Sequence, residues 1–155
     1  MELKDLKSEY EKLARKYGLP SFEEIVLDFE IDKLEKDTEF LLRAIRKSMM
    51  EKIVNSINFL EMLLNPINTP RMYLPFIRTM SNEDRKFIDG IYGALADLTL
   101  LSLDLEIDSN DKAEAELIKK VFDEWKELKP NFKVIISNIK KPKNFVNKKE
   151  RSYFG

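Results

Sequence analysis

The residues with the clearest chemical potential lie in residues 140–155. This segment carries six basic side chains and one acid, so its formal charge is +5, whereas residues 1–139 carry −6. Basic groups neutralise phosphates and aromatic rings stack on bases, so this combination is typical of a nucleic-acid interface. The candidate partner-binding residues are Lys140, Lys141, Lys143, Phe145, Lys148, Lys149, Arg151, Tyr153 and Phe154.

The same segment has a simpler interpretation, which its composition favours. It contains Pro142, concentrates like charge and lacks a continuing apolar stripe. A segment of this kind buries little apolar surface and has little reason to fold. We therefore predict that residues 140–155 form a flexible, solubilising tail, or a tail folded back onto the acidic body. Binding of nucleic acid by this tail is the alternative.

Catalytic chemistry has little support in the remaining sequence. The chain contains no cysteine and no histidine. This excludes thiolate catalysis, disulfides, zinc–sulfur sites and iron–sulfur clusters, and it removes the commonest general base. No phosphate-binding loop, dinucleotide-binding fingerprint, nucleophile elbow or kinase signature is present. We therefore predict a protein that is not an enzyme and has no cofactor.

Two groups of carboxylates resemble metal sites in part. Glu39 and Glu51 alternate with basic residues at a spacing of four, which is typical of a solvated helix face carrying ion pairs. The segment from Asp108 begins like a calcium loop, but Ala113 and Lys119 occupy the positions where an EF-hand needs Gly and Glu. The sequence therefore predicts no metal site.

A candidate apolar patch lies between residues 71 and 80. Its most prominent members are Met72, Tyr73 and Phe76, and Pro75 should break or kink the helix there. We expect this segment to form a lid over the core, and a groove for a ligand or partner is the alternative.

Composition and hydrophobic periodicity predict an all-α fold. Apolar residues make up 43% of the chain and charged residues 35%, and Gly and Pro number only 4 and 6. These values indicate one globular domain over 1–139 and disfavour a turn-rich β fold. We find no transmembrane run and no signal peptide, so we expect a cytoplasmic protein without a membrane partner.

One long helix from Lys33 to Asn65 is expected at the centre of this fold. Asp32 and Glu35 have the spacing of a capping box at its start. Apolar residues then recur at spacings of three, four or seven, as on one helix face. They are Leu34, Leu41, Ile45, Met49, Ile53, Ile57, Leu60 and Leu64.

The helix predicted over Met1–Tyr17 has a narrow apolar seam with two interpretations. The seam residues are Leu3, Leu6, Tyr10, Leu13 and Tyr17. Their 3-4-3-4 spacing suits a coiled-coil homodimer. Two heptads are marginal alone, so we favour packing of this helix on the long one within the same chain.

The remaining periodic segments complete a bundle of about five or six helices. They are 21–29, 71–80, 81–107, 112–128 and 132–139. In the 81–107 helix, Gly90 and Gly93 suggest close approach of another helix. Apolar residues on its two opposite sides suggest that it is sandwiched between two others.

Residues 27–32 and 103–108 are nearly identical in sequence. The match suggests either an old duplication or chance, and chance is favoured because the match is short. Both segments also alternate apolar and charged residues, so a minor two-stranded β pairing is an alternative, although helix is preferred for the second copy.

These patterns together predict a non-catalytic cytoplasmic helical protein that serves as an interaction or scaffold protein. Its partner is expected to be another protein or a second copy of the chain. The alternative function is nucleic-acid association through the basic aromatic tail.

Overall fold

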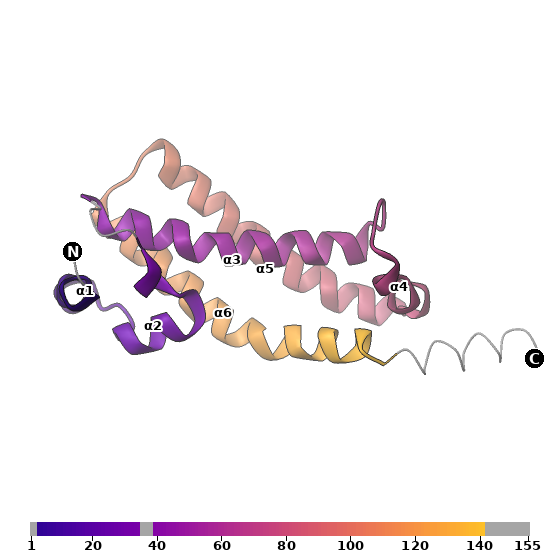
Figure 1. The fold of residues 1–155 in the computed structure, drawn as a ribbon. Helices are drawn as coiled ribbons and strands as arrows, with labels where there is room; N and C mark the ends of the chain where they lie inside the picture. Colours follow the sequence, from indigo (N-terminus) through magenta and orange to yellow (C-terminus); the bar gives the residue numbers. More distant parts are fainter. Residues whose placement is uncertain (1–2, 35–38, 142–155) are drawn as a thin grey trace, which may run out of the picture.

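The structure, a computed structural model, describes residues 3–34 and 39–141, and it is all-α. Three long helices dominate, and shorter elements lie at their two ends (Figure 1). The α-helices are α1 (Leu3–Tyr17), α2 (Phe22–Phe29), α3 (Leu41–Leu64), α4 (Leu74–Thr79), α5 (Asn82–Ile107) and α6 (Asp111–Ile139). Two 3-10 helices are η1 (Ile31–Lys33) and η2 (Arg71–Tyr73).

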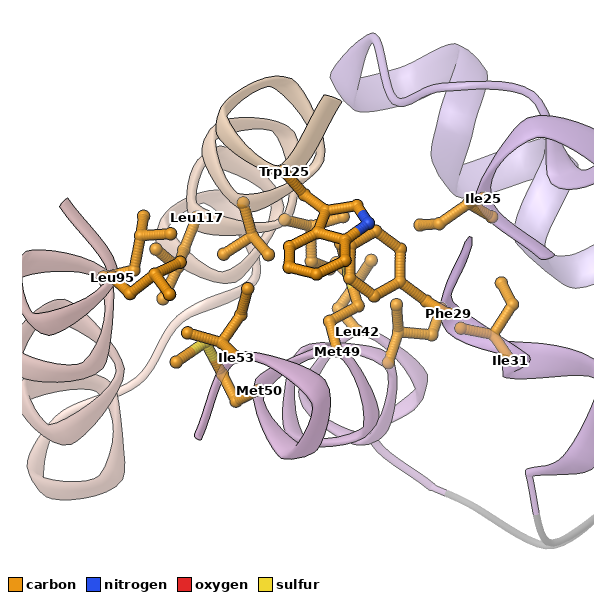
Figure 2. Close-up of a cluster of buried hydrophobic side chains, with 14 of the residues drawn as sticks. Ile25, Phe29, Ile31, Leu42, Met49, Met50, Ile53, Leu95, Leu117 and Trp125 are labelled. Atoms are coloured by element: carbon orange, nitrogen blue, oxygen red, sulfur yellow. The ribbon is translucent and has the colours of Figure 1, made fainter. Parts of the chain in front are cut away.

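The core lies where α3, α5 and α6 pack against one another, as Figure 2 shows in part. The apolar periodicity predicted for these helices is the surface that they bury. Leu60 of α3 and Leu98 of α5 are fully buried, and Trp125 of α6 is 7% exposed. Trp125 packs between Phe29 of α2 and Phe132 of α6, with ring centroids 6.3 and 5.5 Å away. One continuous core therefore extends from α2 through the three long helices.

Helices α1 and α2 cover one end of this core. Helix α2 starts where the 21–29 helix was predicted to start, with a capping box in which Ser21 and Glu24 exchange side-chain and backbone hydrogen bonds. Glu30 ends α2 in the left-handed conformation, with φ 49°, and the chain turns there into η1. The Tyr10 hydroxyl donates to the Pro20 carbonyl at 2.7 Å, which ties α1 to the turn before α2.

The seam of α1 packs inside its own chain, as predicted, but its main contacts are with α2, η1 and α6 and not with the long helix α3. Leu6 and Tyr10 are buried, Leu13 and Tyr17 are half-buried against the core, and Leu3 is 54% exposed. The helix contacts α2, η1 and α6. A homodimer through this seam would first have to detach these two buried side chains from the core.

Helix α3 begins later than the sequence predicted. Residues Ile31–Lys33 form η1, and α3 starts at Leu41, where Phe40 precedes it without a side-chain cap. Asp32 lies in η1 and does not cap α3, and Glu35 lies outside the described residues. With 24 residues, α3 is also shorter than α5 and α6.

The break predicted between the 112–128 and 132–139 helices is wrong, because α6 continues through Pro130 to Ile139. The ring removes one backbone hydrogen bond, but Phe132 and Ile135 beyond it are buried in the core. Figure 1 shows that α6 changes direction along its length, as expected of a helix with an internal proline. The burial of the last turns thus outweighs the local preference to stop.

The near-repeat does not form a β pairing. The described part of the chain contains no strand. Residues 103–107 continue α5, as preferred for the second copy, whereas residues 27–32 span the end of α2 and η1. The final Asp108 of the second copy does not cap α6, because Asn110 caps this helix by accepting from the Ala113 N–H.

No other helix of the described structure closely approaches the glycines of α5. A Cβ placed on Gly90 or Gly93 would meet no atom within 4 Å. The start of this helix agrees with the sequence, because Ser81 and Asp84 form a capping box. Among the helices of residues 3–34 and 39–141, none has the length and hydrophobicity needed to span a bilayer.

Candidate functional site

The predicted partner-binding residues fall mostly beyond the part of the chain that the structure describes. Lys140 follows the end of α6 and Lys141 is exposed beside it. The other candidates lie outside the described residues, namely Lys143, Phe145, Lys148, Lys149, Arg151, Tyr153 and Phe154.

The predicted apolar patch behaves mainly as a lid, which was the favoured interpretation. Tyr73 packs edge-on against Phe59 of α3, with ring centroids 5.9 Å apart, and Phe76 packs against the core. Met72 alone of the three is strongly exposed, at 68%. One exposed methionine does not make a binding surface.

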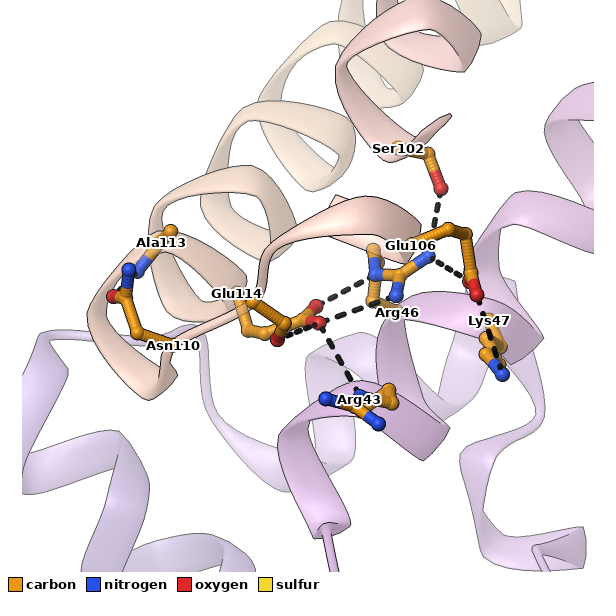
Figure 3. Close-up of polar contacts among 9 residues, drawn as sticks. Arg43, Arg46, Lys47, Ser102, Glu106, Asn110, Ala113 and Glu114 are labelled. Atoms are coloured by element: carbon orange, nitrogen blue, oxygen red, sulfur yellow. Dashed lines mark hydrogen bonds and ion pairs between the residues drawn. The ribbon is translucent and has the colours of Figure 1, made fainter. Parts of the chain in front are cut away.

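A buried charge network joins α3, α5 and α6, and sequence reasoning missed it. Arg46 and Glu114 are each 1% exposed. The Arg46 Nε and Nη2 atoms donate to the two Glu114 carboxylate oxygens at 2.6 and 3.1 Å (Figure 3). The Nη1 atom donates to Ser102 Oγ at 2.8 Å and to Glu106 Oε1 at 2.9 Å. One guanidinium group therefore holds residues from two other helices.

A further hydrogen bond and a further ion pair complete this network. Ser109 donates to Glu114 at 2.8 Å, and Lys47 lies 3.6 Å from Glu106. Burial lowers the pKa of Arg46, but its hydrogen bonds to Glu114 and Glu106 more than reverse this and raise it. The hydrogen bond from Arg46 lowers the pKa of Glu106. Because these charges satisfy one another, the network is suited to holding helices together and leaves no free acid–base pair.

The sequence did contain a signal for this network. Arg46 lies four residues after Leu42 and three before Met49, so it falls on the apolar stripe of α3. The predicted charged face through Glu39 and Glu51 is exposed, but the ion pairs predicted along it do not form. Lys47 pairs with Glu106 of α5, and Arg43 lies 3.9 Å from Glu114 of α6, so their partners are on other helices.

A cleft of about 1020 Å³ lies between the α2–η1 junction, α3 and α6. Lys52 sits in it with its ammonium 5.2 Å from the Trp125 ring and 5.6 Å from the Phe29 ring. It also donates to the Asp28 carbonyl, while Lys129 pairs with the Asp28 carboxylate at 2.7 Å. These lysines bind groups of the chain itself, so their first role is to tie α2 to α3 and α6.

Three strongly exposed apolar side chains lie on one side of α5. Leu100, Leu103 and Ile107 are 61%, 54% and 87% exposed. The predicted second covering helix is therefore absent from the described structure. With Gly93 and Ala96 these residues follow 3-4-3-4 spacing on one face, which we name the α5 stripe. The other side chains more than half exposed, such as Leu27 and Met72, lie on separate elements or on α6.

A groove runs beside the α5 stripe along α3. Its volume is about 620 Å³, and Met50 and Val54 of α3 line it together with Thr99 and Leu103 of α5. Arg46 and Glu106 close one end, so the charge network and the groove meet. The two helices thus present a shallow apolar trough beside an apolar ridge.

The charges around the stripe are of one sign on its own helix. Residues 87–107 contain four acids and no basic residue. At about 100° per residue, Asp97 and Asp104 lie roughly 60–80° to one side of the stripe, and Glu106 lies on the other side. Burial raises the pKa of Glu124 on α6, and the nearby Asp97 and Glu127 raise it further against Lys120. We name Asp97, Asp104 and Glu124 the acidic rim.

The described residues contain no cluster of three or more carboxylates placed to hold a metal ion. Comparison of the chain with protein-family models, with curated proteins and with solved structures gave no significant match.

Proposed function

We propose that this chain is a non-catalytic interaction protein that binds a protein partner through the α5 stripe. The supporting observation is the exposure of Leu100, Leu103 and Ile107 on one face of a well-packed helix. A solvated apolar face at coiled-coil spacing is typical of a helix that docks on another helix. A chain without cysteine gains nothing from an oxidising compartment, so we propose that it acts in the cytoplasm.

The energetics favour a partner at this position. Full burial of one Leu or Ile side chain contributes about 1.5–3 kcal/mol relative to exposure. Three such residues over about two turns would supply several kcal/mol, enough to support a specific complex once association costs are met. The Arg46 network lies directly beside the groove and holds α3 and α5 in register, so little order has to be created on binding.

Site-specific photocrosslinking in the cells that make the protein tests this proposal. A photoreactive amino acid at Ile107 should give discrete protein adducts. The same amino acid at Val134, which is 51% exposed on α6, is the matched control and should give none. Leu100→Lys should abolish the adducts formed from Ile107 without changing the melting temperature. Equal adducts at both positions, or adducts unaffected by Leu100→Lys, would contradict the proposal.

A second candidate function is nucleic-acid binding by residues 140–155. The charge difference between this segment, at +5, and the remaining chain, at −6, supports it. The basic residues are interleaved with aromatic residues, which suits single strands better than duplexes. This function is independent of the α5 stripe, and both can occur in one protein.

A further inference from the structure

The acids beside the α5 stripe restrict the chemistry of what can cover it. Asp97 and Asp104 make no ion pair with any residue that the structure describes, and both are exposed. Glu106, on the opposite side, is already paired with Arg46 and Lys47. A partner that covers the stripe therefore meets two free carboxylates along one edge, with Glu124 of α6 behind Asp97.

A second copy of the chain is a poor occupant of this surface. The natural two-fold pairing sets two α5 helices antiparallel, with Leu100 of one copy beside Leu103 of the other. Asp97 of one copy then lies near Asp104 of the other, twice in each dimer. Like charges brought together across an interface oppose association, and here both contacts would fall along the same edge of a short apolar interface.

A helix with basic residues beside its apolar face matches both the exposed stripe and the acids along its edge. Its apolar residues would bury Leu100, Leu103 and Ile107, and one edge of it would lie over the groove formed by Met50 and Val54. Its lysines or arginines would lie over Asp97 and Asp104. They would also relieve the mutual repulsion of Asp97 and Glu124. The stripe from Gly93 to Ile107 extends about 21 Å, which corresponds to a helix of about 15 residues.

We propose that the α5 stripe and its acidic rim bind a basic amphipathic helix of another protein. The apolar face of that helix packs on the stripe and in the groove against α3, and its basic residues pair with the acidic rim. This proposal rests on the proposed function and specifies the partner. The stripe supplies most of the affinity, and the rim selects the charge of the partner.

Synthetic helical peptides of about 15 residues test this proposal, with fluorescence anisotropy on the full chain as the measurement. One peptide carries leucines at 3-4 spacing with lysines beside them. A second carries glutamates in place of the lysines, and a third is a scrambled version of the first. We expect the first peptide to bind roughly tenfold more tightly than either of the others.

Three variants of the protein identify the surface. Leu103→Lys should abolish specific binding, because it places a charge in the apolar contact. The double variant Asp97→Lys with Asp104→Lys should reverse the preference, so that the glutamate peptide binds more tightly. The control is Glu9→Lys with Asp32→Lys, which makes the same change in net charge at exposed positions of α1 and η1 and should leave the preference unchanged. Circular dichroism and melting temperature establish that each variant is folded.

Each contrary result has a distinct meaning. Equal binding of the basic and scrambled peptides would show general attraction to an acidic protein and overturn the proposal. Equal binding of the lysine and glutamate peptides would remove the charge selection but leave the stripe as a binding surface. Binding by no peptide, with dimerisation of the wild type that Leu103→Lys abolishes, would identify a second copy as the occupant. Loss of the crosslinks at Ile107 would instead contradict the proposed function itself.

Discussion

Arg46 and Glu114 place two opposite charges in the interior, where each needs the other. A buried ion pair often adds little net stability, because desolvation opposes the attraction between the charges. Its geometry here has a more specific consequence, since the planar guanidinium contacts side chains of α5 and α6 at the same time. An apolar residue at this position would leave the rotation of α3 against its neighbours less restricted.

Removing one partner of this pair should be far more harmful than removing both. Arg46→Met leaves the buried carboxylate of Glu114 without its main partner and should lower the free energy of unfolding by about 3–5 kcal/mol. The double variant Arg46→Met with Glu114→Met should lose less than either single variant. Urea denaturation measures both effects, and Arg43→Met, at a 42% exposed side chain, is the control. A double variant as unstable as the sum of the singles would contradict this account.

Acid should weaken the same network through Glu106. Its hydrogen bond from Arg46 lowers its pKa below the ordinary value of 4.5. A carboxylate with a lowered pKa in the folded state adds stability above its unfolded pKa, and that stability is lost as the pH falls through the folded pKa. The wild type should therefore melt higher than Glu106→Gln at pH 7, and this difference should shrink as the pH falls below about 4.5. A difference that is constant or grows toward acid would contradict the prediction.

At the scale of the elements, capping sequences predicted the start of a helix correctly where both hydrogen bonds of the capping box form. The capping boxes at Ser21 and Ser81 marked the starts of α2 and α5 correctly, because both reciprocal hydrogen bonds form. Asp32 and Glu35 had the same spacing, yet α3 begins at Leu41. The chain first has to bury Ile31 in η1, and this tertiary contact outweighs the capping preference. At Pro130, too, burial of the residues beyond it outweighs the local preference to end the helix.

Because Leu60 of α3 lies in the core, truncating its side chain should strongly lower the free energy of unfolding. This side chain is fully buried, as its place on the apolar stripe predicted. Leu60→Ala should lower the free energy of unfolding by about 2–5 kcal/mol, the sum of lost burial and the cavity that remains. Leu27→Ala, at an 82% exposed position of α2, is the control and should change it by less than about 0.5 kcal/mol. Chemical denaturation gives both values, and similar losses would show that α3 does not occupy the core.

Substitution of a glycine of α5 should increase the free energy of unfolding, in contrast to Leu60→Ala. Gly90 has open space where a Cβ would lie, so Gly90→Ala should raise the free energy of unfolding by about 0.5–1 kcal/mol. Gly18 also has open space, but its φ of +68° disfavours any side chain. Gly18→Ala should therefore lower stability by about 1 kcal/mol. A loss at Gly90 would indicate that another surface approaches α5 closely there.

At the scale of the whole molecule, composition and periodicity were enough to predict an all-α fold. They could not predict which apolar face of α5 is covered. The sequence shows Leu98 on one side and Leu103 on the other, and both look suited to burial. Only the arrangement of the long helices shows that Leu98 is buried and that Leu103 is 54% exposed. The candidate binding surface is thus an apolar face that local sequence analysis assigned to the core.

The charge difference between the two parts of the chain leads to the last prediction. If residues 140–155 bind single-stranded nucleic acid, about six phosphate contacts should give a log–log salt slope near −4. A full-length variant with all six basic residues of this segment changed to Gln should lose the binding and the slope. The matched control changes six exposed lysines of the remaining chain, namely Lys4, Lys12, Lys86, Lys112, Lys126 and Lys133.

Anisotropy of a labelled oligonucleotide, measured from low to physiological salt, separates the outcomes. Binding that the control retains and the first variant loses would establish the segment as the interface. Equal losses in both variants would show that total charge matters and position does not, as in weak non-specific binding. Absence of binding by the wild type at low salt would remove this function and leave protein binding at α5. Because the stripe carries no basic residue, neither set of substitutions touches it, so the two functions can be tested independently on one folded protein.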